Sequence, residues 1–253
     1  MFCTEDFEVK RVLKSGERSG KLKVGVKVPE HVMESFFNSD VIGLSTRSKL
    51  ARVFAELFPA SEAYREGNEI VAKVKYANYG FPVIYSRGDK IGRFYAYKEE
   101  DKVEGRELRK IFSGNPAVNV CSDYIEVRLK NDVFYELKKP ESPVRAEEVS
   151  KNPKRFIEKR KKKFDWFLFV TAREVRAPGG CMLVETERIY IPPGNYGVIR
   201  DVTLKGCTRH LNSRVVDPDY KGNLLIEVRV RDPSNIFAKD HAVLIEIYRV
   251  TEP

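Results

Sequence analysis

Two stretches of the sequence carry side chains that suit the handling of a phosphorylated ligand. The first is GLSTRSKLAR at residues 43–52, where Arg47, Ser48 and Arg52 lie at the start of an apolar stripe of helical spacing. Free backbone N–H groups and the helix dipole favour anions at a helix N-terminus, and guanidinium groups match phosphate oxygens. The segment therefore predicts either a polyphosphate site or an ordinary capped helix with solvated arginines.

The second stretch is SRVVDPDYKGNLLIEVRV at residues 213–230, a turn followed by a strand. The turn presents Asp217, Tyr220 and Gly222. Apolar residues at the even positions 224–230 share one face of the strand, so Glu227 belongs to the opposite face and points away from its own core. In a cleft, partial burial would suit Glu227 to act as a general base; in open solvent it would be an ordinary surface glutamate.

Strand signals dominate the elements that must position these residues. Alternating or continuous apolar runs predict strands at 21–28, 69–77, 82–86, 124–137, 188–192, 223–230 and 242–250. Helical spacing predicts a helix at 49–58, and the stop signal Ser-Gly-Asn-Pro after GRELRKIF indicates a second helix at 105–112. Many short strands with few helices indicate a barrel or a sandwich. Residues 81–97 and 236–250 end alike, which indicates either a weak internal duplication or two generic hairpins.

The length, net charge and hydrophobic runs of the chain limit its domain number and the kinds of partner it can bind. The 253 residues allow one large or two small domains, and the net charge of +9 favours an anionic partner, either nucleic acid or a phosphorylated small ligand. No run reaches the roughly 18 apolar residues of a membrane span, and residues 1–10 lack a signal core, so we expect a cytoplasmic protein with no membrane partner.

Cysteine and histidine usage makes a metal site unexpected. The four cysteines and three histidines are scattered without ligand spacing, so we expect no zinc and no protein-held metal. Lysines and arginines crowd the segment 150–167, which is either a solvated surface or a nucleic-acid contact. No nucleic-acid-binding motif accompanies this run, so nucleic acid ranks last among the partners.

Several motifs together resemble one enzyme superfamily. The run RSKLAR at 47–52 resembles the R-S-S-L-A-R motif shared by trimeric dUTPases and dCTP deaminases, and VDPDYKG at 216–222 resembles the I-D-P-G-[FW]-x-G motif of dCTP deaminases. Glu227 follows Asp217 by ten residues, the spacing at which the deaminases carry their catalytic glutamate. RGDKIG at 87–92 is similar to the G-D-x-I-x-Q turn of the superfamily.

The resemblance implies a mainly β fold of two dUTPase-like distorted β-barrels, of the β-clip type, in tandem with a few short helices. Residues 1–102 would form a truncated barrel with the phosphate motif, and residues 103–253 a deaminase-like barrel with the Asp and Glu motif and the basic insertion 150–167. In the second half, the run RDVTLK at 200–205 is at best a degenerate phosphate motif. In the first half, Ser61 stands where the motif aspartate belongs.

The first half thus lacks the Asp motif, and the second half lacks an intact phosphate motif. In the family that the sequence resembles, active sites lie between barrels. The resemblance therefore implies a site at the junction of the halves or between chains, in a trimer or in a compact single chain. The implied ligand is a deoxynucleoside triphosphate, dCTP or dUTP, with Mg²⁺ bound through its phosphates. The implied catalytic residues are Glu227, Ser48 and Asp217: Glu227 activates water without a metal, Ser48 positions that water, and Asp217 accepts from the sugar 3′-hydroxyl. The implied substrate-binding residues are Arg47 and Arg52 for the phosphates and Tyr220 for the deoxyribose, together with Gly222.

Three functions stay open on the sequence alone. Glu227 and Pro218 favour a dCTP deaminase, which releases ammonia from dCTP, over a dUTPase, which releases pyrophosphate from dUTP. A bifunctional enzyme would release both products. A non-catalytic nucleotide-binding relative is the third. It is favoured by the sequence RVTEP at the end of the chain, where the families usually continue into an arm that covers the triphosphate.

Overall fold

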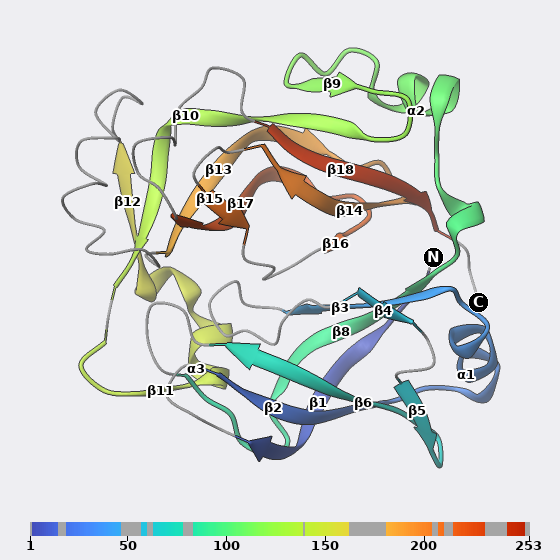
Figure 1. Ribbon diagram of the computed structural model, residues 1–253, viewed down its shortest axis with the longest axis vertical. Helices are drawn as coiled ribbons and strands as arrows, with labels where there is room; N and C mark the ends of the chain where they lie inside the picture. Colours follow the sequence, from blue (N-terminus) through green and yellow to red (C-terminus); the bar gives the residue numbers. More distant parts are fainter. Residues whose placement is uncertain are drawn as a thin grey trace.

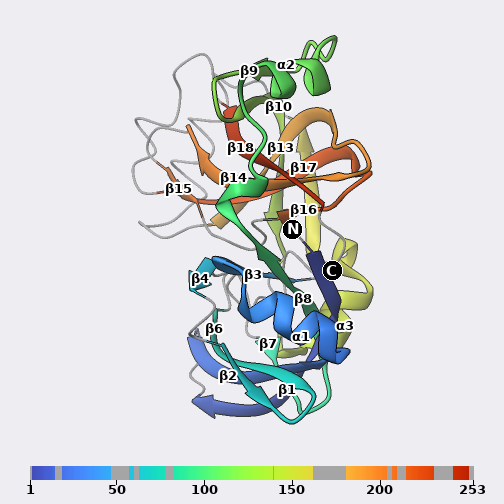
Figure 2. The same ribbon diagram turned by 90° about the vertical axis from the view of Figure 1, so that its right-hand side faces the viewer.

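The chain forms two curled antiparallel sheets. The computed structural model describes residues 2–14, 19–46, 57–59, 63–77, 83–138, 140–161, 181–203, 207–209, 215–230 and 242–250. Within these residues a seven-stranded sheet lies beneath a nine-stranded sheet, with a few short helices at their margins (Figure 1). A view turned by 90° shows the same two layers, joined by residues 98–104, which form the linker between the sheets (Figure 2). The fold is therefore mainly β.

The first sheet and its flanking elements come from the first hundred residues. They are β1 (Phe2–Lys14), β2 (Ser19–Lys27), α1 (Glu30–Phe37), β3 (Val41–Thr46), β4 (Leu57–Pro59), β5 (Ala63–Glu66), β6 (Glu69–Ala77), β7 (Val83–Ile84) and β8 (Lys90–Tyr97). A short 3-10 turn, η2 (Glu99–Asp101), leads into the second half.

The second sheet comes from the rest of the chain. The elements of this half are α2 (Gly105–Phe112), β9 (Val118–Val120), β10 (Ile125–Leu137), β11 (Val144–Arg145), α3 (Ala146–Lys151), η3 (Pro153–Phe156), β12 (Ile157–Lys161), β13 (Cys181–Tyr190), β14 (Asn195–Val202), β15 (Cys207–Arg209), β16 (Val215–Val216), β17 (Lys221–Val230) and β18 (Ala242–Arg249). Among them β11 lies outside the second sheet and pairs with β7 in a separate two-stranded sheet.

The two sheets repeat one strand order. The central path is β3-β8-β1-β2-β6 in the first sheet and β14-β18-β10-β13-β17 in the second. When the five strands of each path are numbered one to five in chain order, both paths read third, fifth, first, second, fourth. Every neighbouring pair in the two paths is antiparallel. The repeated order supports the internal duplication expected from the sequence, which stays a prediction.

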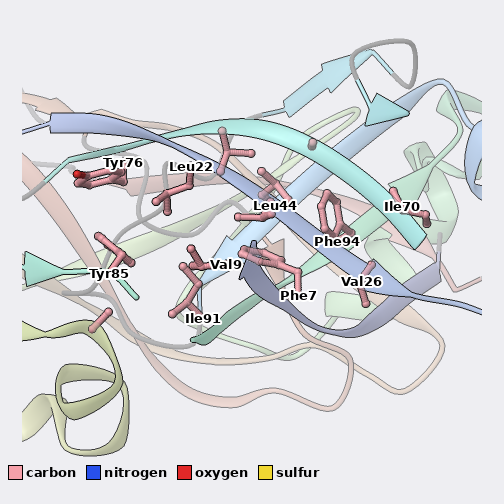
Figure 3. Packing of buried hydrophobic residues seen from close by; sticks show 14 of the residues in the cluster. Phe7, Val9, Leu22, Val26, Leu44, Ile70, Tyr76, Tyr85, Ile91 and Phe94 are labelled. Atoms are coloured by element: carbon pink, nitrogen blue, oxygen red, sulfur yellow. The ribbon is translucent and has the colours of Figure 1, made fainter. Parts of the chain in front are cut away.

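The first sheet closes around its own apolar core. Alternation along β1 and β8 turns Phe7 and Phe94 inward, where their rings meet edge to face with centroids 5.1 Å apart (Figure 3). Phe36 of α1 packs on Phe94 at 5.9 Å and anchors the helix on the sheet. The later segment 144–156 also buries four side chains in this core, and β11 pairs in parallel with β7.

The second sheet has an apolar core of its own, and a third, largely aromatic core joins the two sheets. Its buried members are Tyr95, Tyr97, Tyr196, Val198, Val215 and Tyr248. Tyr95 meets Tyr196 edge to face with centroids 5.6 Å apart, and Tyr97 meets Tyr248 at 4.8 Å. Each of these ring pairs contributes one tyrosine from each sheet, so the junction is a packed interface.

Most of the predicted elements are present. The predicted strands at 69–77, 124–137, 223–230 and 242–250 are found as β6, β10, β17 and β18, and the predicted helix at 105–112 is α2. Phe112 lies one turn after Leu108, and both are buried, so these two residues form the packed face of α2.

The helix predicted at 49–58 is wrong at its end. Leu57 and Phe58 belong to β4, where they pair with Gly43 and Ile42 of β3. The apolar spacing that favoured a helix there also fits a short strand, and pairing with β3 satisfies the backbone of these two residues. Residues 49–56 lie outside the described part of the chain. The sequence also gave no signal for β1, in which charged residues interrupt the apolar alternation.

Candidate functional site

A carboxylate of the second half is bound by a tyrosine of the first. Asp217 directly follows β16, and its Oδ1 accepts a 2.5 Å hydrogen bond from the hydroxyl of Tyr95 in β8. Tyr95 is 1% exposed, whereas Asp217 is exposed. The short distance is typical of a hydroxyl that donates to an ionised carboxylate. The junction therefore fixes one oxygen of a predicted site residue.

The turn that carries Asp217 has a defined geometry. The backbone N–H of Tyr220 donates to the Asp217 carbonyl at 3.3 Å, with Pro218 at the second position and Asp219 at φ 59° in the third. Proline followed by a positive φ is the arrangement of a type II turn, which favours glycine at the third position. The similar deaminase motif has glycine at that position, and aspartate is among the few other residues that tolerate it.

Tyr220 and Gly222 lie together at the start of β17. The Tyr220 hydroxyl donates to the Asn223 carbonyl at 2.7 Å, so the half-buried ring folds back over its own strand. A Cβ on Gly222 would come within 3.3 Å of that hydroxyl, so glycine leaves room for the ring. Burial, and then the charge of Glu185, raises the pKa of Tyr220, which stays a neutral donor.

The surroundings of Asp217 on the first sheet are polar. Arg93 follows the same face of β8 as Tyr95, and its guanidinium lies 3.6 Å from the carboxylate of Asp6. Burial lowers the pKa of Arg93, but Tyr95, Cys3 and Asp217 raise it by more, so the pKa lies above its usual value. Arg93 therefore stays charged, and its positive charge interacts favourably with the negative charge of Asp217.

Glu227 occupies the register position that its alternation predicts. Its neighbours Ile226 and Val228 are buried in the core of the second sheet. Glu227 pairs with Leu183 of β13, and Leu183 belongs to the core of the first sheet. Directly paired residues share a face, so Glu227 lies on the face of β17 that is turned toward the first half. Its side chain is outside the described part of the structure.

A second glutamate, not singled out from the sequence, lies on this face. Glu185 pairs with Leu225, two positions along from the pair of Leu183 and Glu227, and it is 8% exposed. Its Oε1 is 3.8 Å from Lys130. Among the described residues its Oε2 meets no donor at hydrogen-bond geometry. The only sequence signal is a charged residue inside an otherwise apolar strand.

The predicted phosphate ligands Arg47, Ser48 and Arg52 lie outside the described residues. The strand before them is described: β3 ends at Thr46 and contacts β16, which ends one residue before Asp217. The strands that lead into the two predicted motifs therefore meet across the junction.

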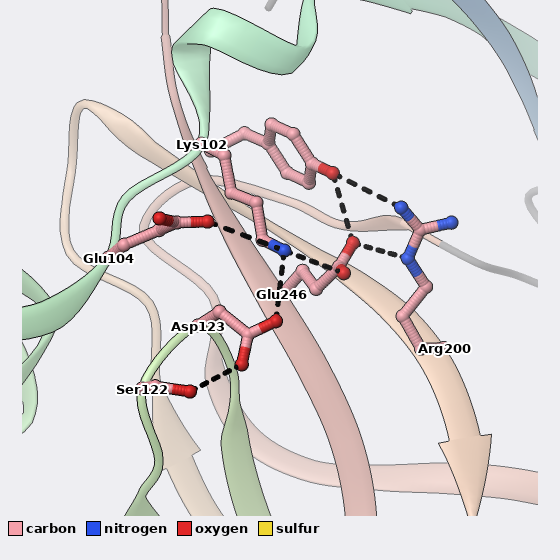
Figure 4. Close-up of polar contacts among 7 residues, drawn as sticks. Lys102, Glu104, Ser122, Asp123, Arg200 and Glu246 are labelled. Atoms are coloured by element: carbon pink, nitrogen blue, oxygen red, sulfur yellow. Dashed lines mark hydrogen bonds and ion pairs between the residues drawn. The ribbon is translucent and has the colours of Figure 1, made fainter.

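The degenerate motif of the second half is occupied by an internal contact. Arg200, its first residue, binds the carboxylate of Glu246, which also accepts from Lys102 at 3.0 Å and from Tyr248 at 2.9 Å (Figure 4). Lys102 belongs to the linker between the sheets and also reaches Asp123 at 3.3 Å. Arg200 thus has a protein anion as its partner.

The basic segment 150–167 is described as far as residue 161. Within that part Lys151 and Arg155 bind Glu147 and Glu148, and Phe156 is buried in the first core. No three residues of the described ranges gather as a cation site. No helix in those ranges is long and apolar enough to cross a membrane.

The two sheets together define the class of fold: two dUTPase-like distorted β-barrels in tandem, mainly β with a few short helices. The structure of this chain is similar to the crystal structure of 2′-deoxycytidine 5′-triphosphate deaminase from Agrobacterium tumefaciens, and the similarity includes both sheets. That comparison covers 99% of this chain and 88% of the deaminase, with a TM-score of 0.57 and 12% sequence identity. No family model matches the sequence, and no curated protein is significantly similar to it. The similarity is one of fold.

Proposed function

We propose that this chain is a dCTP deaminase-like hydrolase with its site at the junction of the two sheets. One observation carries the proposal: β3 and β16, the strands that precede the phosphate motif and Asp217, meet where Tyr95 binds Asp217. The strands that lead into two motifs far apart in the sequence therefore meet there, which supports a site shared by both halves. The fold shared with a structure described as a dCTP deaminase supports the same reading.

Binding would divide between the halves. Arg47 and Arg52 of the first half would hold the triphosphate, which arrives as its Mg²⁺ complex, because guanidinium groups match phosphate oxygens. In the second half Asp217 would accept from the sugar 3′-hydroxyl, and Tyr220 would stack on the deoxyribose. The folded-back ring of Tyr220 is already fixed by its bond to Asn223.

The chemistry would centre on Glu227. Its carboxylate would take a proton from a water held by Ser48 while the water oxygen bonds to C4 of cytosine. The proton would pass to the ring nitrogen N3, which leaves C4 with a hydroxyl and an amino group. Glu227 would then move the hydroxyl proton to the amino group, and the C4–N bond would break to release ammonia and form the C4 carbonyl. The balance is dCTP plus water giving dUTP plus ammonia. General acid–base transfer supplies about 10² to 10⁴ in rate, and the remainder would come from positioning.

A product assay tests the proposal. The wild-type protein is incubated with dCTP or dUTP in the presence of Mg²⁺, and ammonia, uracil nucleotides and pyrophosphate are measured. We expect ammonia from dCTP. Pyrophosphate from dUTP would instead identify a dUTPase, and both products a bifunctional enzyme. Triphosphate binding without either product would identify a non-catalytic relative.

A matched pair of variants tests the assigned base. Glu227→Gln is expected to abolish ammonia release and to leave triphosphate affinity nearly unchanged, because an amide cannot accept the proton. Glu187→Gln on the neighbouring strand β13 makes the same chemical change at a half-buried position and is the control. Turnover retained by Glu227→Gln would refute the assignment.

A further inference from the structure

Tyr95 is held more firmly than an ordinary tyrosine. Its ring packs edge to face on Tyr196, and the side chain is 1% exposed. Its cross-strand neighbours in the first sheet are Cys3 on β1 and Gly43 on β3. Gly43 has no side chain to compete with the ring for space. The hydroxyl of Tyr95 is therefore a fixed donor that points out of the first sheet.

Asp217, by contrast, lies on an exposed turn and depends on this donor for its orientation. Its Oδ1 is engaged by Tyr95. Among the described residues, no hydrogen bond to Oδ2 is formed. An exposed aspartate without the Tyr95 contact would sample several rotamers, and fixing one of them on ligand binding would weaken the complex.

We propose that Tyr95 is a positioning residue for the nucleotide sugar, which fixes Asp217 so that Oδ2 is presented to the 3′-hydroxyl of the ligand. This inference rests on the proposed function. In this proposal the first half binds the phosphates and also orients the sugar contact, because its Tyr95 holds Asp217 of the second half. The contact follows from the packing of the two sheets, since Tyr95 and Asp217 are separated by 122 residues.

The test compares two ligands that differ only at the 3′ position, dCTP and 2′,3′-dideoxycytidine triphosphate. Affinities are measured by titration calorimetry with Mg²⁺ in a Glu227→Gln background, which prevents turnover. The quantity of interest is the ratio of the two dissociation constants. Tyr95→Phe keeps the ring and removes the donor, and we expect it to reduce the preference for dCTP about three- to tenfold. The affinity for the dideoxy ligand should change by less than about twofold.

Two further variants separate positioning from a general structural effect. Tyr97→Phe removes another buried hydroxyl from the same strand and the same junction core, and it should leave the ratio unchanged. Asp217→Asn should remove most of the preference, and adding Tyr95→Phe to it should lower the ratio no further, because the tyrosine acts through the carboxylate.

The outcomes distinguish the two levels of the proposal. A preference for dCTP that survives in Tyr95→Phe would overturn the positioning role and leave the proposed function intact. Equal weakening of both ligands would overturn it as well, because that is the signature of a structural defect. If neither triphosphate binds the Glu227→Gln protein, the proposed function is wrong and the role of Tyr95 fails with it.

Discussion

Arg200 of β14 and Glu246 of β18 form an ion pair inside the second sheet. Arg200 opens the stretch that we interpret as a degenerate phosphate motif. An arginine that already binds a protein carboxylate does not need an external anion, so we do not expect this stretch to bind phosphate. The same carboxylate binds Lys102, which ties the linker between the sheets to the second sheet.

A single nucleotide site per chain is the first expected consequence. Because Arg200 is occupied, only the motif at residues 47–52 remains for a triphosphate. Titration calorimetry with dCTP and the Glu227→Gln protein should give one equivalent per chain. Two equivalents of similar affinity would show that the stretch at residues 200–205 still binds phosphate.

The ion cluster should stabilise the fold measurably. Glu246→Gln leaves Lys102 and Arg200 with a weaker partner, and the side chain of Lys102 is only 13% exposed. Breaking a fully buried pair costs about 3–5 kcal/mol, and the partial exposure of Arg200 lowers the expected loss to about 1–3 kcal/mol. Urea unfolding followed by circular dichroism measures it. Glu100→Gln, in an exposed pair with Lys98, is the control and should change the unfolding free energy by less than about 0.5 kcal/mol.

The turn at Asp219 provides a test of backbone conformation. At φ 59° a residue with a Cβ is strained, and glycine is not. Asp219→Gly should therefore be more stable than Asp219→Ala by about 1 kcal/mol in the free energy of unfolding. Comparing two substitutions at one position cancels the loss of the aspartate carboxylate. Equal stability of the two variants would mean that the turn does not adopt the left-handed conformation in solution.

Stability should fall at alkaline pH because of the junction tyrosines. Burial, and then the nearby Cys3, raises the pKa of Tyr196, and burial, followed by Glu246, raises the pKa of Tyr248. Below the ordinary tyrosine pKa of about 10, both phenols are neutral in the folded and unfolded states, so their contribution is fully present. Above that pH only the unfolded chain loses these protons, and the folded state is penalised.

The expected slope can be measured on a conservative variant. Each buried phenol lowers the unfolding free energy by up to about 1.4 kcal/mol per pH unit above pH 10. Tyr196→Phe should reduce the slope of stability against pH, measured by urea unfolding between pH 9 and pH 11. An unchanged slope would show that the Tyr196 phenol is not shielded from solvent.

Glu185 should cost stability. It is a buried carboxylate whose Oε2 meets no donor among the described residues, and its Oε1 lies 3.8 Å from Lys130, whose side chain is 28% exposed. Burial of so weakly paired a carboxylate is unfavourable, and Lys130 can return to solvent once the carboxylate is removed. Glu185→Leu is expected to raise the unfolding free energy by about 1–2 kcal/mol. Glu187→Leu on the same strand, at a half-buried position, should change it by less than about 0.5 kcal/mol. A loss of stability in Glu185→Leu would show that Glu185 is fully paired in solution.

Much of the local structure was predictable from the sequence. Alternation placed Ile226 and Val228 in a core and Glu227 on the opposite face, and the stop signal after residue 112 identified the end of α2. These features depend on neighbours within a few residues, whose geometry is set by the periods of strand and helix. The same rule explains the error at Leu57 and Phe58, because short apolar runs satisfy both periods.

By itself the sequence determined strands such as β6, β10, β17 and β18, where the turn at residues 217–220 falls, and which motifs resemble those of a nucleotide enzyme. Only the tertiary structure decided that Tyr95 binds Asp217, that Arg200 is neutralised by Glu246, and that Glu185 is buried on the face shared with Glu227. The physical reason is range: strand alternation is local, whereas a bond across 122 residues depends on how two whole sheets pack against each other.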